Sequence, residues 1–244
     1  MKILVIGDSC YDKYVRGTCD RLSPEFPVPV LKLANTSYTS LGMAANVKAN
    51  LEAFGCKVDL ITQQELITKT RFVEERTGHH LLRVDDEWPV TPFDRKQFSD
   101  HRYDCIVISD YNKGFLSEAD IVWIRKTYMG PIFLDTKKTD LAMFEGCIVK
   151  INELEYKLAK TYCSELIVTH GKYGASYEAR VFEAPEVEVH DVCGAGDTFL
   201  AALAFRFTWM ADTPDAIKFA NKAAAITVQH RGVYVLTPED ILSL

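Results

Sequence analysis

The sequence predicts an α/β fold with a mainly parallel central sheet and a small additional sheet. Short β-branched runs alternate with amphipathic helical patterns along the 244 residues, which is typical of repeated βα units. Two segments, about 13–33 and 68–86, instead alternate polar and apolar residues as exposed strands do. We expect one domain spanning 1–244, in which these two segments form a lid over a cleft.

The expected elements of the main body follow in order. Buried strands are predicted at Lys2–Gly7, Val58–Thr62, Cys105–Ser109, Ile132–Asp135, Cys147–Lys150 and Leu166–Thr169. Helices are predicted at Gly42–Phe54, Ser117–Tyr128, Glu153–Thr161, Gly196–Phe207 and Pro214–His230. Gly55 closes the first helix at the C′ position. Thr213 is the expected N-cap of the last helix, with Pro214 in its first turn.

The lid is expected to contain four strands. These are Lys13–Gly17, Val28–Leu33, Thr70–Glu75 and His80–Asp85. Thr77-Gly78 has the composition of a hairpin turn between the last two strands. Prolines such as Pro24 and Pro27 discourage pairing with other strand edges, which suits a sheet that stands away from the main body.

Composition and charge narrow the class of protein. The net charge of −6 argues against a nucleic-acid partner, since phosphate-backbone recognition needs a basic face. Seven cysteines, an odd number without a CxxC pair, favour reduced thiols and a cytoplasmic location. The apolar run at the N-terminus is too short for a signal peptide, and no apolar stretch reaches the roughly 20 residues of a membrane helix.

The sharpest chemical signal lies at 191–199, where a glycine-rich segment enters a helix. Small side chains at Gly194, Ala195 and Gly196 let backbone N–H groups at a helix N-terminus approach an anion. Asp197 beside them is unsuited to binding phosphate but suited to accepting a proton from an attacking hydroxyl. The alternative is purely structural, namely a capped helix preceded by a glycine-rich turn.

This segment resembles the C-terminal GAGD signature of the ribokinase (PfkB) family, with Cys193 where the family usually has Thr or Ser. Other motifs of the family follow in order over the whole chain. The resemblance implies a ribokinase-like three-layer α/β/α domain. It also implies ATP- and Mg²⁺-dependent transfer of a phosphoryl group to a sugar hydroxyl, with Asp197 as base and the Gly194–Gly196 amides as anion hole.

The other resembling motifs imply further roles. Sugar binding is assigned to Asp8, Asp12, Gly42 and Asn46. Nucleotide binding is assigned to Lys137, Asn152, Glu155, Thr169, Gly171, Gly174 and Asn221. Magnesium would be held by Asn152 and Glu155 through water, because Mg²⁺ prefers few direct protein ligands.

Ser23–Val30 (SPEFPVPV) is similar to a segment of the bacterial heptose 7-phosphate kinases within this family, and 108–114 and 135–140 are similar to two others. The similarity implies D-glycero-D-manno-heptose 7-phosphate as acceptor and its 1,7-bisphosphate as product. Lys69, Arg71 and Arg83 would then bind the far phosphate, unless they form only a solvated sheet face. Bifunctional members carry a nucleotidyltransferase domain, before which this sequence ends. Family members also often pair through lid strands, so a homodimer is expected.

Two departures from the family pattern keep alternatives open. Met43 replaces the second glycine of the N-terminal motif. Only Gln63–Ile67 separates a main-body strand from the lid, where relatives usually have another helix and strand. The chain is therefore expected to be a compact kinase for this heptose phosphate. The alternatives are a kinase for another sugar or nucleoside, and a copy that binds sugar or nucleotide without turnover.

Overall fold

The central sheet is built mainly from parallel strands, as the sequence predicts. The computed structural model describes residues 1–99 and 103–244. The sheet has eight strands in the order β13-β12-β11-β10-β9-β8-β1-β5. They are β1 Lys2–Gly7, β5 Lys57–Ile61, β8 Cys105–Asp110, β9 Ile132–Thr136, β10 Ile148–Asn152, β11 Leu166–Thr169, β12 Ala175–Tyr177 and β13 Arg180–Phe182. Among the described strands of this sheet, the β11–β12 and β12–β13 pairs are antiparallel and the other pairs are parallel.

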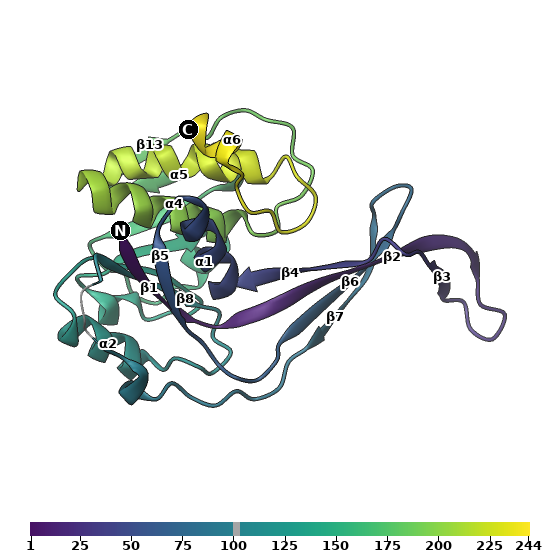
Figure 1. Cartoon of the computed structure of the whole chain (residues 1–244), viewed down its shortest axis with the longest axis horizontal. Helices are drawn as coiled ribbons and strands as arrows, with labels where there is room; N and C mark the ends of the chain where they lie inside the picture. Colours follow the sequence, from purple (N-terminus) through teal and green to yellow (C-terminus); the bar gives the residue numbers. More distant parts are fainter. Residues whose placement is uncertain (100–102) are drawn as a thin grey trace.

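Helices cover both faces of this sheet, which confirms the three-layer α/β/α architecture (Figure 1). The helices are α1 Ala44–Ala53, α2 Glu118–Thr127, α3 Glu153–Leu158, α4 Ala195–Met210, α5 Thr213–Thr227 and α6 Pro238–Leu242. Short 3₁₀ turns occur at Arg95–Gln97, Leu141–Phe144 and Gly171–Tyr173. One apolar cluster joins the sheet to α1, α4 and α5, and a second joins its other face to α2. Strand alternation explains the division, since successive side chains point to opposite faces.

A second, five-stranded sheet projects from the main body, as Figure 1 shows. Its strands are β2 Ser9–Leu22, β3 Pro29–Leu33, β4 Tyr38–Met43, β6 Thr68–Glu74 and β7 His80–Asp86. Strand β2 lies in the middle and pairs with β3, β4 and β6. The predicted turn at Thr77-Gly78 does separate the antiparallel strands β6 and β7. We call this sheet the lid sheet.

Several predicted boundaries were wrong. Gly42 and Met43 end strand β4 rather than begin helix α1, and β4 itself was not predicted. Asp212, not Thr213, caps α5, because its side chain accepts a hydrogen bond from the Asp215 amide at 2.9 Å. Helix α3 stops at Leu158 instead of Thr161. Strands β12 and β13 and helix α6 were also missed, since elements of three to five residues carry little periodic signal.

The shortened region noted in the sequence lies at one edge of the main sheet. Strand β5 is the last strand in the order, and within the described residues it pairs only with β1. The chain then passes directly from β5 into lid strand β6 without another helix. The main sheet therefore ends at the strand from which the lid sheet begins.

Candidate active site

The largest described cavity, about 1170 Å³, lies where parallel strands end against the start of α4. Ligand sites in open α/β sheets form at the carboxyl ends of strands, and typical small-molecule cavities are about 300–1,000 Å³. The lining includes Tyr111, Asp135, Lys137, Lys150, Asn152, Thr169, Gly171, Gly174, Gly194, Ala195, Gly196 and Asn221. Nine of the residues that the sequence assigned to catalysis or nucleotide binding thus share one cavity.

Helix α4 starts at the cavity wall with backbone amides that the helix leaves free. Gly194 is the N-cap residue, and its φ of 79° lies in the left-handed region that favours glycine. A Cβ on Gly194 would also lie 2.9 Å from Nδ2 of Asn46. The first i→i−4 bond of the helix runs from the Thr198 amide to the Gly194 carbonyl at 2.9 Å. The amides of Gly196 and Asp197 precede it, so this turn can receive an anion.

Asp197 is buried in the first turn of α4 and held through both carboxylate oxygens. Nδ2 of Asn46 donates to Oδ2 at 3.0 Å, and the Tyr111 hydroxyl donates to Oδ1 at 2.9 Å. The amide of Asn50 donates to Oδ1 of Asn46 at 3.1 Å, which orients the Asn46 amide. Burial raises the pKa of Asp197 to about 6, although the two hydrogen bonds lower it. A carboxylate with that pKa is suited to general-base chemistry near neutral pH.

Tyr111 is a site residue that the sequence analysis did not single out. Its side chain lines the cavity, and burial raises the pKa of its hydroxyl well above the usual range. The Lys69 ammonium lies 5.5 Å from its ring centroid, and the Lys137 ammonium lies 5.0 Å from it. The Tyr111 ring therefore lies near both Lys69 of the lid and Lys137 of the cavity, and its hydroxyl donates a hydrogen bond to the Asp197 carboxylate.

The NxxE motif forms the start of helix α3. The Asn152 side chain accepts from the Glu155 amide at 2.9 Å, and Glu155 Oε2 accepts from the Asn152 amide at 2.7 Å. This reciprocal pair is a capping box, which satisfies two free amides of the helix. The other Glu155 oxygen forms an ion pair with Lys137. The motif thus fixes the Glu155 carboxylate beside Lys137, which lines the cavity.

The cavity lining also contains Thr169, Gly171, Gly174 and Asn221 and a set of apolar residues. Val187, Val189, Val192, Ala224, Ala225 and Val228 supply the apolar surface. The Asn221 amide nitrogen donates to the Phe182 carbonyl at 2.7 Å, so this side chain ties α5 to strand β13. The lining thus combines an apolar slot with lysines and the N-terminus of helix α4.

Asp12 and Arg71 lie at the root of the lid sheet and pair with each other. Both side chains are nearly buried, with 7% and 10% of their surface exposed. Gly42 is paired with Cys10 across β2 and β4, and a Cβ on Gly42 would clash with Oδ2 of Asp12. Arg71 is therefore committed to a carboxylate, although the sequence suggested it for a phosphate.

The remaining predicted sugar ligands are dispersed. Asp8 is buried and accepts hydrogen bonds from the amides of Tyr111 and Lys113 at 2.8 and 3.3 Å, so it anchors the loop after β8. Burial, and then the nearby Asp110 carboxylate, raise the pKa of Asp8. Arg83 pairs with Asp85 on the exposed face of β7. Of the three predicted lid cations, Lys69 is the one placed toward Tyr111.

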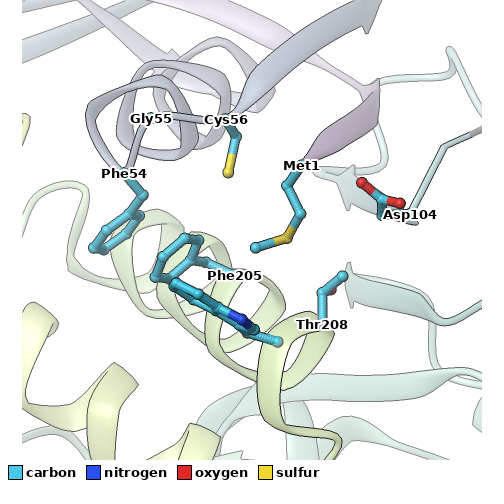
Figure 2. Close-up of a pocket in the computed structure, with 8 residues that line it drawn as sticks. Met1, Phe54, Gly55, Cys56, Asp104, Phe205 and Thr208 are labelled. Atoms are coloured by element: carbon cyan, nitrogen blue, oxygen red, sulfur yellow. The ribbon is translucent and has the colours of Figure 1, made fainter.

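A second cavity, of about 500 Å³, lies at the opposite end of the sheet (Figure 2). Met1 and Asp104 precede strands β1 and β8, so they mark the amino ends of the strands. Phe54, Cys56 and Phe205 are among the lining residues drawn in Figure 2. The Asp104 carboxylate accepts from the Lys2 amide at 2.7 Å, and burial raises the pKa of the Cys56 thiol. This cavity has no paired base and anion site, so we place the candidate active site in the larger one.

Comparison with known proteins supports the resemblance to the ribokinase (PfkB) family found in the sequence. A model of the "pfkB family carbohydrate kinase" matches residues 133–240, which include α4 and Asp197. Ribokinase from Thermotoga maritima superposes with a TM-score of 0.73 at 16% identity, covering 99% of this chain and 98% of that one. Phosphofructokinase-2 from Escherichia coli, in complex with substrates and products, gives 0.75 at 12% identity, covering 100% and 98%. The chain is thus similar to the pfkB family over residues 133–240, and the superpositions show a ribokinase-like fold over nearly its whole length.

Among curated proteins, the chain is similar to bifunctional HldE proteins. It is 30% identical to that of Hydrogenovibrio crunogenus over 98% of this chain and 62% of the relative. It is also 30% identical to that of Helicobacter acinonychis over 98% of this chain and 65% of the relative. The chain thus spans less than two thirds of the length of these relatives. The first alignment runs over 297 positions, more than the chain's 244 residues, so this relative contains insertions that the chain lacks.

Proposed function

We propose that this protein transfers the γ-phosphoryl group of ATP to a hydroxyl of a sugar phosphate, with D-glycero-D-manno-heptose 7-phosphate as the preferred acceptor. The observation that carries the proposal is the placement of Asp197. It is a buried carboxylate with a raised pKa, adjacent to free helix amides and to Gly196, which lines a cavity large enough for a nucleotide. Base, anion site and donor cavity therefore meet at one turn of helix.

In the proposed reaction, Asp197 accepts the proton of the attacking hydroxyl. That hydroxyl would approach Oδ1, the oxygen that now accepts from Tyr111 at 2.9 Å. Asn46 keeps its bond to Oδ2 and so fixes the carboxylate during the transfer. The amides of Gly196 and Asp197 receive the developing negative charge of the phosphoryl oxygens. The Tyr111 hydroxyl marks the position that the acceptor hydroxyl would occupy.

ATP is the donor that a kinase of this family implies, and the cavity residues suit it. The apolar slot beside Asn221 suits a base, whereas Lys137 and the start of α4 suit phosphates. Asn152, Glu155 and Asp135 supply oxygens for Mg²⁺ through water, and Oδ1 of Asp135 is buried without a described hydrogen-bond partner. When bound, Mg²⁺ would neutralise phosphate charge and orient the phosphoryl group.

The preference for a heptose phosphate rests on resemblance rather than on a complete binding site. Ser23–Val30 resembles the heptose 7-phosphate kinases, and this segment joins β2 to β3 at the far end of the lid sheet. Lys69 remains available to a distal phosphate and lies close to Tyr111. These two features support a phosphorylated sugar that reaches from Asp197 toward the lid.

One observation favours a second candidate, a kinase for a sugar or nucleoside without a phosphate. Arg71, the most deeply buried of the predicted phosphate ligands, is paired with Asp12. A buried pair of this kind resists separation, because each freed charge would have to be solvated again. An acceptor that needs only hydroxyl contacts would leave this pair intact.

We further propose that the lid sheet pairs two copies of the chain. Its strands leave Leu22, Leu33, Leu82 and Val84 largely exposed. Exposed apolar surface of this kind marks an interaction surface. Light scattering at working concentration should give twice the 27.6 kDa chain mass, whereas a monomer would contradict the proposal.

The decisive experiment is a coupled assay of ATP turnover with Mg²⁺ against heptose 7-phosphate, fructose 6-phosphate, ribose and adenosine, run beside Asp197→Asn. Turnover that is highest with heptose 7-phosphate and collapses in the variant supports the proposal. Preference for ribose or adenosine selects the second candidate. ATP binding without turnover on any acceptor would instead show a copy that binds without catalysis.

A further inference from the structure

A lysine–aspartate pair is buried directly beneath the first turn of α4. Lys150 on β10 and Asp135 on β9 are direct partners in the parallel register. Their side chains are only 4% and 5% exposed, and Nζ of Lys150 lies 2.7 Å from Oδ2 of Asp135. The positions preceding them on the same face, Phe133 and Ile148, are apolar core residues. The pair therefore replaces core packing at the end of the sheet that meets the cavity.

Stability alone does not account for this pair. Removing two charges from water costs about as much as their attraction returns, and apolar residues of similar volume are often at least as stabilising. Oδ1 of Asp135 is also buried without a described hydrogen-bond partner, which adds to the cost. The position of the Lys150 charge relative to the cavity offers another explanation for the pair.

The Lys150 ammonium lies beside the start of α4, next to the position that the proposed reaction gives to the phosphoryl group. Its Nζ is 3.5 Å from the Gly196 carbonyl, and a Cβ built on Gly196 would come within 3.1 Å of it. Lys150 lines the cavity together with Gly194–Gly196. An ammonium has three N–H donors, of which Asp135 takes one and the Gly196 carbonyl receives a long contact. A further donor can point into the cavity while the pair with Asp135 stays intact.

We propose that Lys150 is a catalytic residue that donates a hydrogen bond to the phosphoryl group in transfer, with Asp135 holding its ammonium in place. The inference rests on the proposed use of this cavity for the donor. It differs from the role of Lys137, which pairs with Glu155 in a more exposed position. Lys150 supplies a fixed positive charge on the sheet side of the phosphoryl group, opposite the helix amides, where charge develops in the transition state.

The test compares ATP with ADP by calorimetry without acceptor, with and without Mg²⁺. A contact to the terminal phosphoryl group affects only ATP, so Lys150→Met should weaken ATP binding about 10- to 100-fold and leave ADP binding unchanged. Lys138→Met is the matched control, because Lys138 forms a similarly buried pair with Asp110, 6% and 0% exposed, outside the cavity lining. It should leave the ATP-to-ADP ratio as in the wild type.

Folding is controlled with Lys150→Met/Asp135→Asn, compared without Mg²⁺ because Asp135 is also assigned to the proposed Mg²⁺ site. This double variant leaves no unpaired buried charge and should show the same selective loss of ATP binding. Equal weakening of ATP and ADP, or an unchanged ratio in a folded variant, would overturn the role of Lys150. Asp197→Asn separates this result from the wider proposal, since it should lose turnover but still bind ATP. If the wild type binds neither nucleotide, the proposed donor site and this inference both fail.

Discussion

The main sheet and the lid sheet differ in how far their polar side chains are buried. At the end of the main sheet, Asp197, Asp135 and Lys150 are nearly buried and held by neighbours on separate elements. On the lid sheet, the buried charged residues that the structure describes are Asp12, Arg71 and Glu74, while the outer strands expose both charged and large apolar residues. The polar side chains of the main body are held in place before any ligand binds. The exposed side chains of the outer lid strands are held by fewer neighbours until a ligand binds.

This difference separates two kinds of effect. Changes in the main body should alter the chemical step, because preorganised groups act on the transition state. Changes on the outer lid should alter acceptor binding or association and leave the chemical step intact. The buried pair at the lid root should behave like the main body. Each of the following predictions tests one side of this comparison.

The largest effect is expected at the base. Asp197→Asn keeps the shape of the side chain and removes its basicity, so kcat should fall by about 10²- to 10⁴-fold. Arg83→Ala, on the exposed face of β7, should leave kcat unchanged. Steady-state kinetics with saturating ATP measures both. A variant Asp197→Asn that keeps most of its kcat would rule out the assignment of the base.

The two lid arginines should differ in stability. Arg71→Met leaves Asp12 buried without its partner, which should cost about 3–5 kcal/mol of unfolding free energy. Arg83→Met breaks a pair whose arginine is 58% exposed and should cost less than about 1 kcal/mol. Urea unfolding of both variants is the measurement. Similar losses would show that the lid root is no more ordered than its outer strands.

The rate should depend on the protonation of Asp197, whose pKa is raised to about 6. Below that pH, kcat/KM should fall about tenfold per pH unit, and above it the profile should level. Because the folded pKa exceeds the ordinary 3.8, stability from this group is present at low pH and is lost as pH rises through about 6. Asp197→Asn should therefore melt above the wild type at neutral pH, with a gap that narrows on acidification. A constant gap would contradict this account.

The smallest effect concerns Met43, which is buried and has a φ of 59° at the junction of lid and main body. Both Met43→Gly and Met43→Ala lose the buried side chain, but only glycine relieves the backbone strain. The glycine variant should therefore be more stable than the alanine variant by about 1 kcal/mol. Thermal melts of the two proteins decide it, and a more stable alanine variant would show that the backbone there is not strained.

Local signals explain what the sequence predicted. The helix entered by the GAGD segment and most strands of the main sheet carry their pattern within a few neighbouring residues, and the structure bears out these predicted elements. Tyr111 was missed because its hydrogen bond to Asp197 joins residues 86 positions apart. The pairing of Arg71 with Asp12 depends on the parallel register of β2 and β6, which no local pattern encodes. Lys150 was read only as the end of a core strand, because nothing nearby in sequence indicates its partner.

The position of β5 at the edge of the main sheet has a consequence for the aggregation of the protein. An unpaired strand edge can recruit other strands, and proteins commonly protect such edges with charge. Lys57 and Asp59 are exposed along β5, and Asp59 is engaged by Lys2 and by the Tyr103 hydroxyl at 2.8 Å. These charges act as gatekeepers against aggregation. Neutralising them should lower the protein concentration at which the chain precipitates, even where its catalytic rate is unchanged.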